Sequence, residues 1–164
     1  MRGRAIRLSV PRRMVIDLLY FAKGIPSLPV QRRMSIRPVV AARAACHDRP
    51  RWTAIFAKAY ALVAREFPEL RRAYIKIPWA HLYEYPASNG NIVIERDYRG
   101  EPCVFSITVK DPAAYRLADL SGLIQHASTA PIEDIKDYRR MLRIAGLPLP
   151  LPADVQSKPP HQPA

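Results

Sequence analysis

A change in hydrophobic period constrains the fold of this chain more than any other feature. From Thr53 to Phe67 the apolar residues recur at helical spacing, with Thr53 placed to cap the helix and Pro68 placed to end it. We expect one broad apolar face to be buried, formed by Ile55, Phe56, Ala59, Leu62 and Val63. The alanines of this stretch make the helix slim, so that another element can approach it closely.

Downstream of this helix the period changes from 3.6 to 2, which is typical of strands. Short strands are expected at 74–77 and 81–85, and a β-hairpin at 91–96 and 103–109. Helices then follow, one opened by Pro112 and one opened by Pro131 and ending at Gly146. The pattern predicts an α/β chain, a two-layer α+β sandwich with helices packed on a mixed, largely antiparallel sheet.

Upstream, three further elements are expected. Residues 9–23 have helical rhythm, with Ser9 as the cap and Gly24 as the end. Residues 25–36 contain an alternating run that predicts an edge strand, and residues 39–46 an alanine-rich helix.

The chain has 164 residues, enough for one globular domain. We expect a basic arm at 1–8, a domain at 9–146 and a proline-rich, disordered tail at 147–164. The apolar runs near Val15 and Leu18 are too short to cross a bilayer. The two cysteines, Cys46 and Cys103, form no CxxC pair, and a reducing cytoplasm is the expected setting.

The net charge of +12 is concentrated near the N-terminus. Residues 1–50 carry 11 basic and 2 acidic side chains, and the remainder carries 15 and 12, so the first part contributes +9 and the second +3. Twenty of the 26 basic residues are arginine, which a GC-rich coding sequence also produces. The excess can instead mark a basic face that meets phosphate.

Catalytic motifs are sparse. The four histidines, His47, His81, His126 and His161, have no partner at metal-ligand spacing, and structural or solvated roles are favoured for them. A phosphate loop and a nucleophile elbow are both missing. We therefore predict no metal site and assign no catalytic residue.

The order of the segments resembles the first half of the catalytic domain of the 2-oxoacid dehydrogenase acyltransferases, the superfamily of chloramphenicol acetyltransferase. The matching pieces, which lie between about residues 12 and 127, are Arg12 or Arg13, Ile25-Pro26, Lys58-Ala59, Phe67-Pro68-Glu69-Leu70, Asn91-Ile92, Gly100 and Val109-Lys110-Asp111. The resemblance implies a truncated version of that fold.

The resemblance also implies CoA-dependent acyl transfer between small-molecule donors and acceptors. It further implies a homotrimer, or association with a full-length homologue. The family's base is a histidine in an HxxxDG motif, and His47, His81 and His126 all depart from that pattern. The family's early arginine pairs with the motif's aspartate, so Arg12 or Arg13 is expected to be solvated or to find another acid. Arg32, Arg33 and Lys58 are the candidate contacts for a CoA phosphate.

Three functional hypotheses remain open. The first is a truncated or divergent acyltransferase-like protein with little or no catalysis of its own, and the second is an active enzyme with a nonstandard base. The third is a basic module for nucleic acid or anionic surfaces. Its candidate contacts are Arg2, Arg4, Arg7, Arg12, Arg13, Arg32, Arg33 and Arg37. The basic cluster has no interleaved aromatic residues, which disfavours nucleic acid. The predicted hairpin would also be left with an exposed edge, which a partner chain normally covers.

Overall fold

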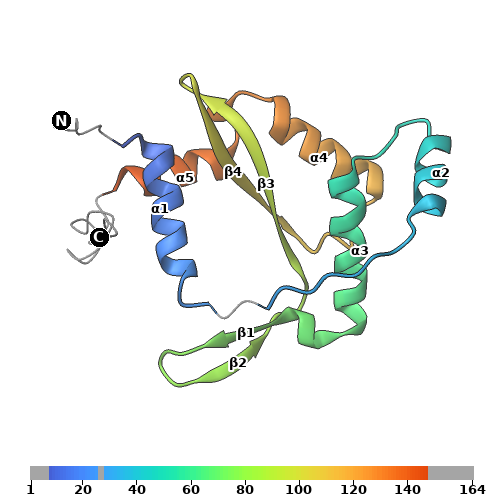
Figure 1. The fold of residues 1–164 in the computed structure, drawn as a ribbon, viewed down its shortest axis with the longest axis horizontal. Helices are drawn as coiled ribbons and strands as arrows, with labels where there is room; N and C mark the ends of the chain where they lie inside the picture. Colours follow the sequence, from blue (N-terminus) through green and yellow to red (C-terminus); the bar gives the residue numbers. More distant parts are fainter. Residues whose placement is uncertain (1–7, 26–27, 148–164) are drawn as a thin grey trace, which may run out of the picture.

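The computed structural model describes residues 8–25 and 28–147 (Figure 1). Within them the chain forms five α-helices and two antiparallel hairpins. The mixed α/β class is therefore confirmed. The single mixed sheet is not, because the described strands form two separate two-stranded sheets. Of the basic arm predicted at 1–8 and the tail predicted at 147–164, residues 1–7 and 148–164 lie outside the described residues.

Helix α1, Val10–Ala22, lies close to its predicted position. Pro11 occupies its first turn, where a missing N–H costs nothing, and Arg13 N donates to Ser9 O over 3.0 Å. Ser9 stands at the cap position, but its side chain makes no capping hydrogen bond. Only Pro11 of this helix is buried.

The predicted strand at 25–36 is wrong. Residues 28–36 have no regular structure, and Val30 and Met34 are 85% and 67% exposed. Alternation can stabilise a strand only where a second strand accepts its hydrogen bonds, and none of the described strands pairs with this segment. Helix α2, Arg37–Ala45, follows it and buries no residue.

Helix α3, Trp52–Glu66, begins one residue before the predicted cap Thr53. Arg51 takes the cap position, and its backbone N–H donates to Ser121 Oγ over 3.0 Å. The helix ends at Glu66, just before the predicted stop at Pro68, where a short 3₁₀ turn, Pro68–Arg71, begins. The buried face of α3 differs from the prediction and is described below.

The two hairpins differ in length. Strand β1, Arg72–Ile75, pairs with β2, His81–Glu84, while β3, Asn89–Tyr98, pairs with β4, Glu101–Lys110. The β3–β4 turn is only two residues, Arg99 and Gly100, with φ values of 57° and 79°. Two positive φ values in succession match the twist of the flanking strands and fix the register.

Helix α4, Leu117–Thr129, and helix α5, Lys136–Gly146, cover one face of the β3–β4 hairpin. Pro112 does not open α4 directly but lies in the turn before it, and a 3₁₀ turn, Ile132–Asp134, precedes α5. Phe105 of β4 stacks on Tyr138 of α5 at 4.6 Å between ring centroids, and both side chains are fully buried.

Helix α5 also covers the outer edge of β4. Ser106 N donates to Met141 Sδ over 3.3 Å, and Thr108 N donates to Asp137 Oδ2 over 2.9 Å. The position of Asp137 in the first turn of α5 predicts only an interaction with the helix dipole, and this contact is an additional one. None of the described helices has the length and apolarity needed to cross a membrane.

Candidate assembly interface

The structure does not bring the predicted CoA contacts into one site. Arg32 and Arg33 lie on the exposed segment 28–36, and their side chains make no hydrogen bond or ion pair with another described residue. Lys58, on α3, donates through Nζ to Ala113 O over 3.0 Å and to Tyr115 O over 2.5 Å. Two of its three N–H groups therefore hold the loop before α4. The assignment to CoA phosphate stays a prediction.

The Val109-Lys110-Asp111 motif ends β4, and Asp111 leads into the turn that α3 fixes from one side. Asp111 has a positive φ of 44°, its N–H donates to Ser88 O over 2.8 Å, and its Oδ2 accepts from Arg65 Nη2 over 3.0 Å. Lys58 and Arg65 are seven residues apart and so lie on one face of α3. Both basic side chains hold the chain between β4 and α4, a structural role that the sequence pattern did not predict.

The three described histidines do not form a catalytic group. His47 is exposed after α2, and His126 is exposed on α4. His81 begins β2, and its Nδ1 lies 2.7 Å from Trp79 O. The fourth, His161, lies outside the described residues. Among the residues that the structure describes, no cluster of three or more metal-ligating side chains occurs.

The basic cluster of the N-terminal third is divided between different roles. Arg12 forms an ion pair with Glu101, with 3.8 Å between its Nε and Glu101 Oε2. Arg43 donates to Pro50 O over 2.7 Å and lies 5.1 Å over the ring of Trp52. Arg13 and Arg37 are exposed, and Arg2, Arg4 and Arg7 lie outside the described residues. Binding to an anionic surface stays a prediction.

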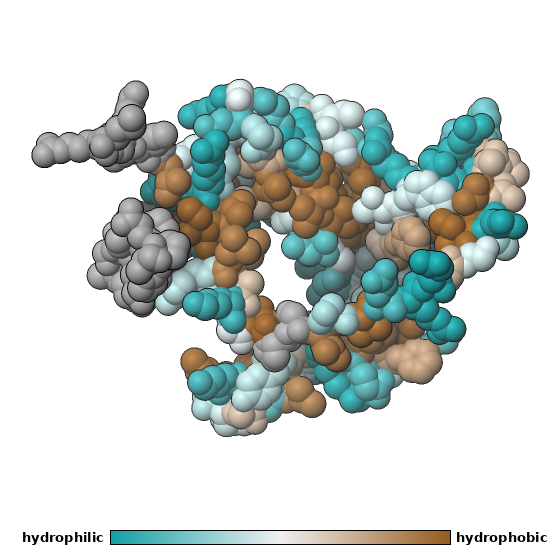
Figure 2. All heavy atoms as spheres, in the orientation of Figure 1, coloured by the Kyte–Doolittle hydropathy of each residue, from teal (hydrophilic) through white to brown (hydrophobic). Residues whose placement is uncertain are grey.

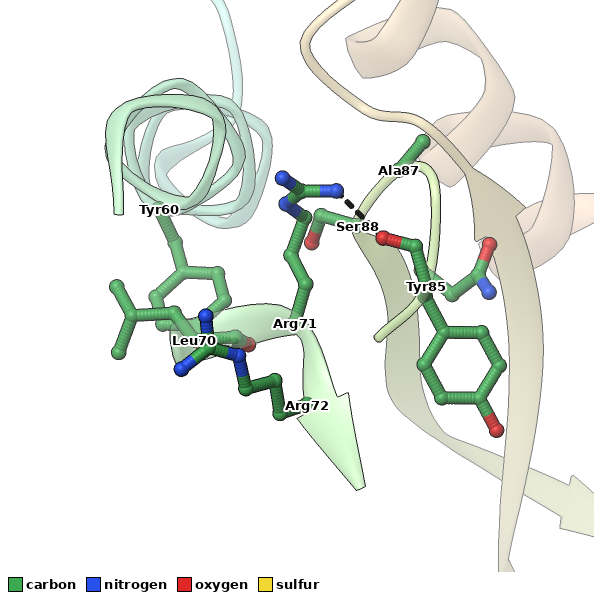
Figure 3. Close-up of a pocket in the computed structure, with 8 residues that line it drawn as sticks. Tyr60, Leu70, Arg71, Arg72, Tyr85, Ala87 and Ser88 are labelled. Carbon is green, nitrogen blue, oxygen red and sulfur yellow. Dashed lines mark hydrogen bonds between the residues drawn. The ribbon is translucent and has the colours of Figure 1, made fainter. Parts of the chain in front are cut away.

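A pocket of about 330 Å³ lies between α3, the 3₁₀ turn after it and the loop from β2 to β3 (Figure 3). Arg71 points into it, but its guanidinium already donates to Ala64 O and Tyr85 O and lies 3.7 Å from Glu84. Arg72, on its rim, is paired with Glu84 at 2.9 Å and Glu69 at 3.5 Å. These arginines hold separate segments of the chain together. Glu69 and Glu84 balance their positive charge, so little of it is left to attract an anion.

The two groups with shifted pKa values belong to the core. Burial raises the pKa of the Cys103 thiol above its ordinary value of 9.0. Burial also raises the pKa of Tyr138 above 10.0, although Arg96 acts against it. Tyr138 donates to Ala127 O over 2.9 Å, and Arg96 donates to Ala127 O and Ala130 O at the end of α4. Both shifts are consequences of packing.

Helix α3 turns three of its five alanines inward and most of its large apolar side chains outward. Ala54, Ala61 and Ala64 are completely buried, whereas Phe56 is 55% exposed and Val63 46%. The predicted buried face was therefore wrong, because the small side chains allow the close approach to β3 and α4 that the large ones would prevent. Among the described residues, the large face is left without a partner.

The same outward display occurs on neighbouring elements, and Figure 2 shows hydrophobic residues along the margin of an opening in the middle of one face. We define the apolar surface by the large hydrophobic side chains of α1, of α3 with its following turn, and of the β1–β2 hairpin that are at least 37% exposed. They are Val15, Ile16, Leu18, Leu19, Phe21, Phe56, Tyr60, Leu62, Val63, Phe67, Leu70, Tyr74, Ile77, Trp79, Leu82, Tyr83 and Tyr85.

The size of the apolar surface can be compared with that of known interfaces. Its eight aromatic side chains alone expose roughly 800 Å², about half of some 200 Å² each. Each partner of a standard protein interface buries about 800 Å², whereas the largest apolar patch of a typical monomer is about 300–600 Å². Summed over α1, α3 and β1–β2, the exposed aromatic side chains therefore offer about as much apolar area as one partner of an interface buries.

Comparison of the chain with protein-family models, with curated proteins and with solved structures finds no match.

Proposed function

We propose that this chain is a non-catalytic, acyltransferase-like subunit that functions by assembling with further copies of itself through its apolar surface. The observation that carries the proposal is the orientation of α3, whose alanine face is buried and whose Phe56, Leu62 and Val63 face outward. Burying this surface in an assembly would remove apolar area from water, at about 25 cal/mol per Å². The resemblance in sequence supports the acyltransferase-like part of the proposal.

The absence of catalysis is supported by the separation of the candidate groups. No described histidine contacts another titratable side chain that could act with it, and Lys58 is engaged with backbone carbonyls. A general base needs a proton acceptor within hydrogen-bond reach of its substrate and a group that orients it. CoA binding through Arg32 and Arg33 remains compatible with an assembly role.

The mass of the intact chain in solution tests the assembly. We expect a light-scattering mass above the 18.6 kDa of one chain, increasing with concentration. The double variant Phe56→Ser with Val63→Ser removes two apolar groups seven residues apart on one face of α3 and should lower the mass of the assembly. Glu66→Ser, a polar change on the same helix, is the control and should leave the mass unchanged. A wild-type chain that stays monomeric at all concentrations would refute the proposal.

The catalytic half of the proposal has a separate test. The intact chain is incubated with acetyl-CoA and a small thiol or hydroxyl acceptor, and CoA release is followed with a thiol reagent. We expect no release above the buffer control. Robust turnover would show that the chain carries its own base, and alanine replacement of His47, His81 and His126 in turn would then locate it.

A further inference from the structure

The β3–β4 hairpin has one covered edge and one open edge. Asp111 N donates to Ser88 O, which makes 88 and 111 a hydrogen-bonded pair and, by the alternation of an antiparallel ladder, also 92 with 107 and 94 with 105. The amide groups of Asn91, Val93 and Glu95 therefore point away from β4. On the other side, α5 covers the edge of β4 through Met141 and Asp137.

The open edge is long, and its charged residues, Glu95, Arg96 and Asp97, are confined to its second half. Strand β3 runs for ten residues and contains neither proline nor lysine, while β4 carries Pro102 and Lys110. Among the described residues, no acceptor is found for the amides of Asn91, Val93 and Glu95. The side chain of Val93, at the middle of the strand, is 62% exposed.

The sequence of β3 is complementary to itself when read in opposite directions. Val93 is flanked by Ile92 and Ile94, and two residues out on either side stand Asn91 and Glu95. Four residues out stand Asn89 and Asp97. In an antiparallel pair with its two-fold axis at Val93, each asparagine amide would face a carboxylate of the other copy, and no two carboxylates would be opposite each other.

We propose that two copies of this chain join through their β3 edges, antiparallel and with Val93 on the two-fold axis. The outward amides and carbonyls then form about ten backbone hydrogen bonds in five paired positions. Gly90, which has no side chain, faces Arg96 of the other copy, and Arg96 keeps its bonds to the end of its own α4. Asp97 uses Oδ1 for Gly100 N, at 3.0 Å, and has Oδ2 left for Asn89 of the other copy.

The register follows from the same residues. Displacing the pairing so that its axis lies at Ile94 would put Val93 opposite Glu95, and an axis at Glu95 would put two carboxylates together. An axis at Ile92 would put Val93 opposite Asn91. Displacing the pairing by one residue would put residues whose backbone N–H and C=O groups point away from β4 opposite residues whose groups already bond to β4. Only the axis at Val93 matches apolar with apolar and amide with carboxylate at every outward position from 89 to 97.

This inference rests on the proposed function, since it takes the partner to be a second copy of the chain. It adds a two-fold seam, which differs from the three-fold arrangement that the sequence resemblance implies. The seam uses the edge of β3, and the apolar surface of α1, α3 and β1–β2 remains a separate contact. The two can therefore be tested independently.

The seam is tested by sedimentation of the intact chain over a range of concentrations. Val93→Pro removes an amide that makes no bond within the hairpin. It should lower the mass of the assembly to what the apolar surface alone holds together, and should leave only monomer when combined with Phe56→Ser and Val63→Ser. Asn91→Glu places like charges opposite each other at both ends of the seam and should raise the dimer dissociation constant about fivefold or more. Adding Glu95→Lys to Asn91→Glu should restore the dimer, because the new carboxylate at position 91 then faces the new ammonium group at position 95 of the other copy. Asn91→Thr, neutral at the same position, is the matched control and should stay dimeric.

The pattern of variants that lose the assembly distinguishes the β3 seam from the apolar surface. Circular dichroism monitors folding, and if Val93→Pro disturbs the hairpin, the charge swap at 91 and 95 carries the test alone. A monomeric wild type overturns both proposals. An assembly that persists in Val93→Pro and in Asn91→Glu, but is lost in the double variant Phe56→Ser with Val63→Ser, overturns the β3 seam and keeps the proposed function. The reverse pattern supports the seam and refutes the apolar surface of α3.

Discussion

Two regions of this molecule have similar hydrophobic sequences but opposite packing. In the core region, formed by β3–β4, α4 and α5, large apolar side chains such as Phe105, Leu120 and Tyr138 are fully buried. In the open region, formed by α1, α2, segment 28–36 and β1–β2, Pro11 is the only buried residue among those that the structure describes. Helix α3 lies between them, with alanines toward the core and Phe56 and Val63 toward solvent. A hydrophobic sequence predicts that a surface will be buried. It does not tell whether the covering residues belong to the same chain or to another one.

The largest expected effect separates the two regions directly. Tyr138→Ala leaves a cavity in the core region and removes one of the two hydrogen bonds to Ala127 O, and should lower the free energy of unfolding by about 3–5 kcal/mol. Trp79→Ala, in the open region, removes a side chain that is 69% exposed and should change the stability of the monomer by less than about 0.5 kcal/mol. Urea unfolding at a monomeric concentration measures both. Equal losses would contradict the division into two regions.

A second prediction concerns Arg96, which joins β3 to the C-terminal end of α4 in the core region. Arg96 donates to Ala127 O at 2.8 Å and Ala130 O at 2.9 Å, satisfying carbonyls that the end of α4 leaves without partners. Arg96→Ala should cost about 2 kcal/mol, the range for hydrogen bonds from a charged donor. Arg139→Ala, on the exposed side of α5, should cost nothing measurable in the same unfolding experiment. A neutral Arg96→Ala would mean that water replaces the guanidinium at the helix end.

Glycines sharpen the comparison at a smaller scale. Gly100 has a φ of 79° in the turn of the core hairpin, and a Cβ there would meet no atom within 4 Å. Gly100→Ala should therefore lower stability by about 1 kcal/mol through backbone strain alone. Gly24→Ala, after α1 in the open region, also meets no atom and needs no positive φ, so its effect on the unfolding midpoint should be near zero. A larger loss of stability for Gly24→Ala than for Gly100→Ala would contradict the division into a core region and an open region.

The smallest expected effect is a dependence on alkaline pH. The pKa values of Cys103 and Tyr138 are raised in the folded chain, so both protons are held more tightly there than in the unfolded chain. Their contribution is fully present below the unfolded pKa values and is lost as the pH rises through the folded ones. Stability should thus decline from about pH 9 upward. Cys103→Ala should remove the earlier part of the decline, whereas the exposed Cys46→Ala should not. An identical profile in both variants would contradict this.

The sequence predicted the periodic elements well and their partners poorly. The hairpin was confirmed because alternation on both strands and Gly100 between them are local features. The strand at 25–36 was wrong because alternation alone does not show whether a second strand exists to pair with it. Pro112 and Pro131 were placed one turn early, since proline is equally suited to the turn before a helix.

The candidate interface was missed for a related reason. The periodicity of α3 favoured burial of its large face, and only the packing of Ala54, Ala61 and Ala64 reveals that the small face points inward. The five alanines in that stretch were the available signal, because a slim face permits close contact between helices. Lys58 was predicted as a phosphate contact, and its bonds to Ala113 O and Tyr115 O depend on a loop far away in sequence.

Hydrogen exchange of the intact chain at a monomeric concentration tests the central claim most directly. We expect slow exchange, close to the limit of global unfolding, for amides of β4, α4 and α5, and fast exchange for α1, α2 and β1–β2. We also expect α1 and β1–β2 to gain protection when the concentration is raised until the chain assembles. Uniformly slow exchange across both regions in the monomer would contradict it, because the open region would then be stable without a partner.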